Sequence, residues 1–156
     1  MSDILNRVYK KTKIIHNIYL KHKLLIKRKS YSMEGEDLEV LRLSKNMNNG
    51  FYVDVGCYHP THLNNTYLLY KKNWTGINID LSEFSIDLFN FVRPKDININ
   101  CAISEVEGEV IYYHQKKFSQ LTTIIKEEAL KRMQGFIREK KIWSQKLTTV
   151  LDKSKF

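Results

Sequence analysis

The stretch F-Y-V-D-V-G-C-Y-H-P, residues 51–60, decides how the rest of the chain is interpreted. Its first five residues are rich in aromatic and β-branched side chains, which favour a buried strand. Asp54 near the end of that strand and Gly56 just after it predict a turn. Many nucleotide-binding folds receive a ligand at such a turn, although the second and third glycines of a dinucleotide-binding fingerprint are absent here.

Two further segments repeat the pattern of this first strand. Gly76–Asp80 and Asp96–Cys101 are short and carry isoleucine at alternate positions. Between the three segments, apolar spacing predicts helices over Leu63–Lys72 and Ser82–Val92. Strands that alternate with helices in this way predict a parallel sheet joined by right-handed crossovers. The predicted fold class is therefore α/β, with a Rossmann-like sheet.

The rest of the body carries three weaker patterns. A turn at Gly35 precedes a short helix, and residues 105–114 predict a turn at Gly108 followed by an additional strand. Residues Thr123–Lys141 predict a long charged helix, with Gly135 as its weak point. The candidate inner positions of the two helices are Leu38, Leu41, Leu43, Ile124, Leu130, Met133 and Ile137.

Residues 1–30 form a basic leader, separate in charge from the domain expected over residues 31–156. Residues 1–29 hold nine Lys or Arg against one acid, Asp3, for a net charge of +8, whereas the remainder has a net charge of +1. Apolar residues recur in the leader at helical spacings, with lysines between them, so we expect an amphipathic basic helix. The recurring apolar residues are Ile4, Leu5, Val8, Ile14, Ile15, Ile18, Tyr19, Leu25 and Ile26.

Two kinds of partner fit the apolar face of this leader. An anionic membrane surface would contact it through residues 4–29, and the alternative is packing on the domain or on a second subunit. Nucleic acid is not favoured, because the tyrosines form no stacking platform and no recognised nucleic-acid motif occurs.

Composition bounds the class of protein. With 156 residues and 42% apolar side chains, the chain fits one globular domain with a real core. Two cysteines, Cys57 and Cys101, are too few for a disulfide framework, so buried thiols in a reducing compartment are expected. No apolar run is long enough to span a bilayer and no signal-peptide pattern occurs. A cytoplasmic protein is predicted, peripheral to a membrane if the leader binds one.

The candidate site follows from the expected sheet, since ligands of an open parallel sheet bind beyond the carboxyl ends of its strands. Asp80 ends the second strand, 24 positions after Gly56, where a carboxylate can accept the hydroxyls of a ribose. Small and apolar residues at the third strand end can line an adenine, and these are Ala102, Ile103 and Ser104. A single glycine disfavours close contact with a pyrophosphate, which points to S-adenosylmethionine rather than NAD.

Three runs of the chain together resemble the FkbM-type family of S-adenosylmethionine-dependent methyltransferases. They are YSMEGEDLEVL (31–41), GFYVDVGCYHPTHLNNTYLLYKKNWTGINID (50–80) and RPKDININCAISEVEGEVIYY (93–113). The similarity is collinear from Tyr31 to Asp152. It implies a class I methyltransferase fold, S-adenosylmethionine as cofactor, and O-methylation of a hydroxyl on a sugar, glycan or other small metabolite.

The resemblance also implies roles for individual residues. Asp54 and Gly56 correspond to the first motif, beside the methionine part of the cofactor, and Asp80 corresponds to the ribose-binding acid. Ala102, Ile103 and Ser104 correspond to the segment beside the adenine. Glu36 lies in the family's Gly-Glu-Asp segment, which precedes the first strand and is expected to close over the cofactor. Ser119–Thr123 occupies the place of a Ser-rich segment, and Met33 replaces the family's usual glutamine.

The resemblance ends before the family's fourth strand, which carries an Asp-x-Glu-Gly motif. Residues 146–152, K-L-T-T-V-L-D, are similar to the segment just before it. We therefore expect the N-terminal half of the family's domain, with a sheet truncated after its third parallel strand and an open edge beside the first. A second chain or a second copy would complete that edge. The alternative function is a non-catalytic cofactor-binding or interaction fragment, inactive alone or complemented by a second chain.

Histidines supply the remaining candidates. His59 and His62 could be metal ligands, but no third ligand lies nearby in the sequence, so no metal is expected. His59 is a candidate general base that would deprotonate an acceptor hydroxyl. Asp54 has an alternative role as a cap of the loop or helix that follows it.

Overall fold

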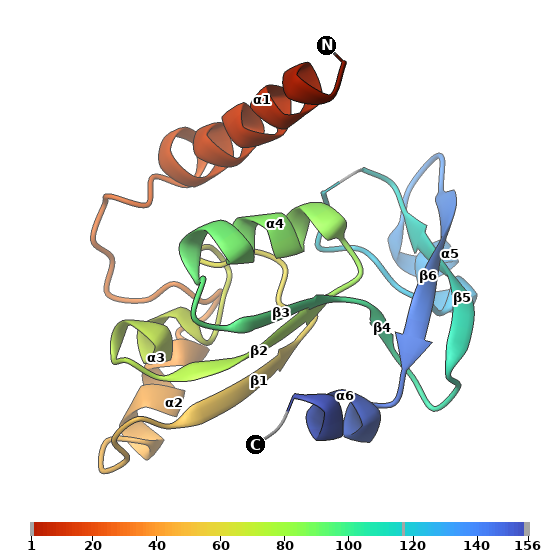
Figure 1. The fold of residues 1–156 in the computed structure, drawn as a ribbon. Helices are drawn as coiled ribbons and strands as arrows, with labels where there is room; N and C mark the ends of the chain where they lie inside the picture. Colours follow the sequence, from red (N-terminus) through yellow and green to blue (C-terminus); the bar gives the residue numbers. More distant parts are fainter. Residues whose placement is uncertain (1, 117, 155–156) are drawn as a thin grey trace.

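The computed structural model describes residues 2–116 and 118–154. Helices and strands alternate between residues 36 and 100 (Figure 1). Their bounds, in chain order, are α1 Ser2–Ile15, the π-helix η1 His16–Lys21, α2 Glu36–Leu43, β1 Phe51–Val55, α3 Tyr67–Lys71, β2 Thr75–Asp80, α4 Glu83–Val92, β3 Ile97–Asn100, β4 Ala102–Ile103, β5 Gly108–His114, α5 Lys126–Arg132, β6 Arg138–Gln145 and α6 Leu147–Lys153.

The expected parallel sheet is confirmed. Its strand order is β1-β2-β3, with Val53 beside Ile77 and Ile77 beside Ile97. The crossovers carry α3 and α4, so the order is β-α-β-α-β, as in Rossmann-like folds. Helix α4 begins where the sequence predicts, because the Ser82 hydroxyl accepts a hydrogen bond from the backbone N–H of Ser85. Helix α3 is shorter than the predicted Leu63–Lys72.

One face of this sheet is apolar. Alternation along the strands places isoleucines of β2 and β3 on the same side, and α6 packs on them through Val150, Leu147 and Leu151. The β1 residues on that side lie beyond the helix: Phe51, Val53 and Val55 are between 39% and 51% exposed. Strand β1 pairs only with β2 within the described residues. The open edge expected beside the first strand is therefore present.

The opposite face is polar and is organised around Arg93, which is fully buried. Its guanidinium donates to the Thr66 hydroxyl at 2.8 Å and to the Tyr52 hydroxyl at 3.3 Å. Each hydroxyl in turn donates to a carboxylate, Thr66 to Asp54 at 2.9 Å and Tyr52 to Asp96. Two hydroxyl groups thus connect one buried cation to two acids, one on strand β1 and one just before β3.

Further contacts of Arg93 fix the loop between β1 and α3. The guanidinium donates to the Asn64 side-chain oxygen at 2.6 Å and to the Pro60 carbonyl. It also lies over the Phe89 ring, 4.8 Å from the centroid. A single side chain from the end of α4 therefore holds the segment 60–66 against the sheet.

A second, smaller sheet has the strand order β4-β6-β5, with β5 and β6 antiparallel. The additional strand expected after Gly108 is confirmed as β5. The long helix expected over Thr123–Lys141 is wrong: α5 covers only Lys126–Arg132, and residues 138–145 form strand β6. The helix ends before Met133, whose backbone is extended, and Gly135 follows with a left-handed φ of +85°. Strand β5 takes the segment after Gly135 as its partner.

The basic N-terminal helix is present, as α1 continued by η1. It lies across α4 on the side away from the sheet (Figure 1), where Ile14 and Ile18 pack against Leu88. Lys10 forms an ion pair with Asp87 at 2.8 Å. Within residues 2–116 and 118–154, no helix combines the length and the apolar character needed to cross a membrane.

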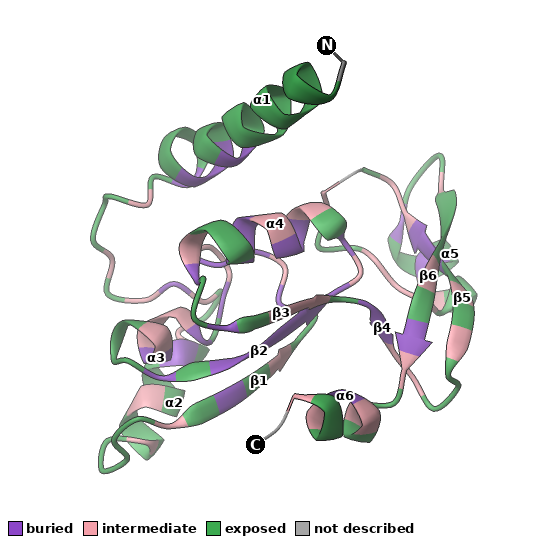
Figure 2. Cartoon of the chain, viewed as in Figure 1, coloured by how far each residue is buried: buried purple, intermediate pink, exposed green. Residues whose placement is uncertain are grey.

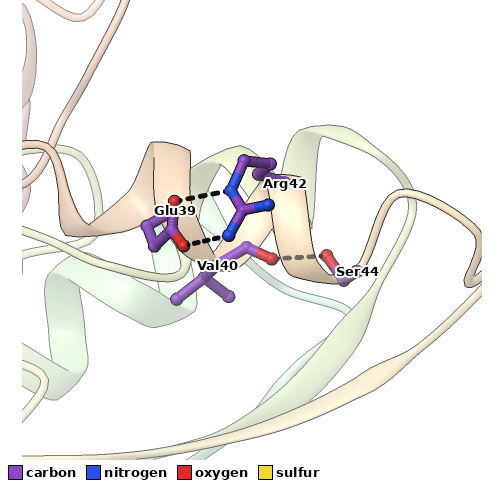
Figure 3. A network of polar contacts seen from close by, with 4 residues as sticks. All are labelled: Glu39, Val40, Arg42 and Ser44. Atoms are coloured by element: carbon purple, nitrogen blue, oxygen red, sulfur yellow. Dashed lines mark hydrogen bonds and ion pairs between the residues drawn. The ribbon is translucent and has the colours of Figure 1, made fainter.

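Helix α2 follows the turn at Gly35, but only one of its three expected inner leucines is inside. Leu41 packs against Tyr52 and Trp74, whereas Leu38 and Leu43 are exposed. The outer surface of α2 carries a two-bond pair between Arg42 and Glu39, at 2.6 and 2.8 Å (Figure 3). This pair lies in solvent and contrasts with the buried Arg93.

The two arginines give a matched test of stability. Arg93→Met should lower the free energy of unfolding by about 3–5 kcal/mol, because two buried acids and two hydroxyls lose the cation that they surround. Urea unfolding followed by circular dichroism measures the change. Arg42→Met, which removes an exposed pair, should leave the midpoint within error. Equal effects of the two substitutions would contradict the central role of Arg93.

Candidate functional site

A cleft of about 360 Å³ lies at the carboxyl ends of the parallel strands. One wall comes from the ends of β1, β2 and β3, and the other comes from the segment that precedes α5. Its lining residues are Val55, Gly56, Tyr58, Leu63, Ile79, Asp80, Leu81, Cys101, Ile103, Ser119, Gln120, Thr122, Thr123 and Ile124. Three residues predicted from the sequence, Gly56, Asp80 and Ile103, meet in this cleft.

Asp80 is the buried acid of the cleft. One carboxylate oxygen accepts the backbone N–H of Tyr58 and the other that of Ser82, each at 2.8 Å. Burial is the main effect on its pKa, which it raises, and the two backbone N–H groups oppose that shift. Each carboxylate oxygen has a second lone-pair direction, so Asp80 retains acceptor capacity for a ligand.

Gly56 places the chain turn at the edge of the cleft. Its φ of +78° is left-handed, a conformation that glycine adopts without strain. Its N–H donates to the Ile79 carbonyl at 2.8 Å, which ties the turn to strand β2. A Cβ at this position would meet no atom within 4 Å, so the backbone faces open space.

The second wall is anchored to the smaller sheet. Thr123 pairs with Tyr113 of β5 through two backbone hydrogen bonds, at 2.8 and 3.2 Å. At the other end of the segment, the Phe118 ring stacks on Tyr58, with centroids 4.7 Å apart. The Ser119–Thr123 segment, which the family resemblance places before a helix, therefore covers the cleft from the side opposite Asp80.

Four other predicted residues lie outside the cleft lining. Ala102 is buried beneath it, next to Ile103, and the Ser104 hydroxyl pairs with that of Ser144 at 2.8 Å. Glu36 is exposed at the start of α2, where it accepts the backbone N–H of Glu34 at 2.8 Å, and its pKa is lowered by such backbone hydrogen bonds.

The fourth of these residues is Asp54, which belongs to the Arg93 network. Its carboxylate accepts from Thr66 at 2.9 Å and from the Asn64 amide at 3.3 Å. Burial raises its pKa, and the hydrogen bond from Thr66 opposes the shift. Through these contacts Asp54 holds the loop that follows β1, as its alternative role predicts.

Next to Glu36 in the sequence, Asp37 is fully buried. It accepts hydrogen bonds from the Ser30 and Ser32 hydroxyls and from the Tyr31 backbone N–H, at 2.7 to 2.9 Å. Asp37 thus fastens the end of the leader to the domain. The sequence offered one signal for it, a Ser-Tyr-Ser run shortly before the acid.

His59 is buried, and both of its ring nitrogens have partners. Nε2 lies 2.9 Å from the Asn17 side-chain oxygen, and Nδ1 accepts the Thr61 backbone N–H at 3.1 Å. Burial lowers its pKa to about 2, so the ring is neutral. His59 therefore joins the leader to the loop after β1, and it lies outside the residues that line the cleft.

Two more histidines surround His59. The His22 ring lies 4.3 Å from that of His59 and 4.2 Å from that of His62. The pKa of His22 is lowered to about 4, mainly by burial and in addition by charge repulsion from His62, Lys21 and Arg28. The rings of His22 and His59 and of His22 and His62 meet at tilted angles of 53° and 31°. Within the described residues, no group of three or more His, Cys, Asp or Glu side chains could hold a metal ion.

No family model, curated protein or solved structure matches the chain.

Neutral His22 makes the junction between leader and domain sensitive to acid. Because its folded pKa of about 4 lies below the unfolded value of about 6.5, His22 stabilises the fold fully above pH 6.5 and loses that contribution as the pH falls toward 4. Between about pH 7.5 and about pH 5, the free energy of unfolding should fall by roughly 1–2 kcal/mol through this residue.

Urea unfolding at the two pH values tests this expectation. His22→Gln should reduce the loss of stability in acid. The matched control His16→Gln changes an exposed histidine of the same leader and should leave the loss unchanged. An identical pH dependence in His22→Gln and the native chain would refute the assignment.

Proposed function

We propose that this chain binds S-adenosylmethionine in the cleft at the strand ends and acts as an S-adenosylmethionine-dependent O-methyltransferase. It would act in the cytoplasm on a hydroxyl of a sugar or another small acceptor. The observation that carries the proposal is the buried Asp80 carboxylate in a cleft at the carboxyl edge of a parallel sheet. The volume of that cleft, about 360 Å³, lies within the range of roughly 300–1,000 Å³ of small-molecule sites.

The residues present fit the nucleoside part of this cofactor. Asp80 retains lone pairs for ribose hydroxyls, and Ile103 with Cys101 offers an apolar surface for an adenine. The open backbone at Gly56 leaves room for the remainder of the molecule. The resemblance of residues 31–41, 50–80 and 93–113 to FkbM-type methyltransferases supports the same choice of ligand.

When bound, S-adenosylmethionine supplies an electrophilic methyl group on a positively charged sulfur. Methyl transfer would form a C–O bond to the acceptor hydroxyl and break the C–S bond, with S-adenosylhomocysteine as the leaving group, and the hydroxyl proton would pass to solvent water. The chain itself would align the acceptor with the methyl group and exclude water. The wall formed by Ser119–Thr123, opposite Asp80, is suited to this task. His59 is poorly suited as the base, since both of its nitrogens have partners.

One observation favours a second candidate, a cofactor-binding or interaction domain without activity of its own. The edge of β1 is open, and its exposed valines, Val53 and Val55, continue the apolar face that α6 covers on β2 and β3. Such an edge pairs readily with another strand. Under this candidate, a second chain or a second copy would contribute the strand beside β1.

Calorimetric titration with S-adenosylmethionine tests the binding. The native chain should bind it, and Asp80→Asn should weaken binding about 10- to 100-fold through the loss of a charged hydrogen bond. Thr122→Trp, which fills the cleft from the other wall, should also weaken binding, and Asp152→Asn on α6 is the control. Native affinity in both cleft variants would rule out the cleft as the binding site.

Turnover separates the two candidate functions. Formation of S-adenosylhomocysteine with a pool of sugar acceptors supports the enzyme. Binding without turnover supports the second candidate.

The open edge gives a further prediction under the second candidate. The native chain should self-associate, and Val53→Lys with Val55→Lys should make it monomeric, because charges on an edge strand oppose pairing. Light scattering after size-exclusion chromatography measures the mass. Ile111→Lys, an exposed position of β5, is the control. A native chain that is monomeric at all concentrations would exclude pairing between copies.

A further inference from the structure

Helix α1 carries an apolar stripe that the domain leaves uncovered. Ile4, Leu5, Val8 and Ile15 are between 48% and 69% exposed. With a turn of about 100° per residue, Ile4, Val8 and Ile15 lie within about 40° of one another around the helix axis. Figure 2 shows α1 exposed along most of its length, with buried positions only near its end.

The stripe differs from the side by which the leader is docked. Ile14 and Ile18 contact α4, and Lys10 pairs with Asp87 on the same helix. Ile14 lies about 80° from Ile4 around the axis, so the docked side and the stripe are separate faces. The leader thus meets the domain with one face and presents a second apolar face to the outside.

Cations border this second face. Around the helix axis, Lys11 lies about 20° and Arg7 about 60° from Ile4, on the side of the stripe that leads to Ile14, and both are exposed. Within the described residues, Lys10 is the only leader cation in an ion pair, and most of the other lysines and arginines of the leader are exposed. The loop after η1 adds Leu25 and Ile26, both exposed, beside further lysines and an arginine at positions 23, 27, 28 and 29.

We propose that the leader docks on an anionic lipid surface, with α1 parallel to the membrane plane and its stripe in the interface. Apolar side chains flanked by Lys and Arg are the pattern of interfacial helices, in which long cationic side chains reach the headgroups. A net charge of +8 over residues 1–29 complements an anionic leaflet, and a nearly neutral domain adds little to it. The inference is independent of the methyltransferase proposal.

Vesicle co-sedimentation with the full chain tests the proposal. The chain should sediment with vesicles of phosphatidylcholine and phosphatidylserine, should bind pure phosphatidylcholine at least about tenfold less, and should be released by high salt. Ile4→Gln with Val8→Gln should weaken binding about tenfold without loss of helix, because glutamine favours helices. Arg7→Gln with Lys11→Gln should weaken binding and reduce its dependence on salt.

The matched control replaces two exposed apolar residues outside the leader, Leu43→Gln with Phe136→Gln, and should bind as the native chain does. Circular dichroism verifies the fold of every variant. Equal binding of the stripe variant and the control would overturn the proposal, as would equal binding to charged and uncharged vesicles. A stable dimer that ignores vesicles and becomes monomeric in the stripe variant would assign the stripe to a second copy instead.

Discussion

The structure depends on one buried cation. Arg93 leaves the end of α4 and enters the polar face of the sheet, where hydroxyls connect it to Asp54 and Asp96. The arrangement avoids an isolated buried charge, since each acid and the cation are linked through a group that both accepts and donates. Without that link, both acids would lie in a low-dielectric environment with no compensating charge.

The same network positions the cleft at the strand ends. By holding the segment 60–66, Arg93 fixes the loop that leaves β1, and this loop carries Tyr58 and Leu63 to the cleft. Tyr58 then donates its N–H to Asp80, so the cleft acid is oriented by a loop that depends on Arg93. The residues that hold the sheet together and the residues that line the cleft are therefore linked along one connected path.

The sequence predicted the local features well. Strands β1, β2 and β3 could be found because isoleucine and valine alternate in short runs, and the cleft lies at their ends for topological reasons. Strand β6 could not be found, because its lysine-rich sequence favours a helix and its identity depends on pairing with β5, about 30 residues away. Only the position of Gly135 hinted at the break.

Register explains which of the predicted residues line the cleft. Asp80 is the last residue of β2, where it pairs with Asn100 of β3, and Gly56 directly follows the last residue of β1, so both reach the cleft. Asp54 is paired with Asn78, inside the sheet, so its carboxylate meets the Arg93 network instead. A shift of one or two positions along a strand decides whether a residue reaches the cleft or the Arg93 network. Composition alone carries no information about this register.

The two sheets are joined by two neighbouring chain segments, one from β3 to β4 and one from β6 to α6, which together are called the neck. The chain leaves the parallel sheet at Cys101 to form β4, and it returns after Gln145 to place α6 on the same sheet. These crossings are neighbours, because Ile103 pairs with Gln145. The cleft lies at this neck and has one wall on each side of it. A small molecule in the cleft would therefore act as a non-covalent cross-link across the neck, and its binding energy would couple the unfolding of the two sheets.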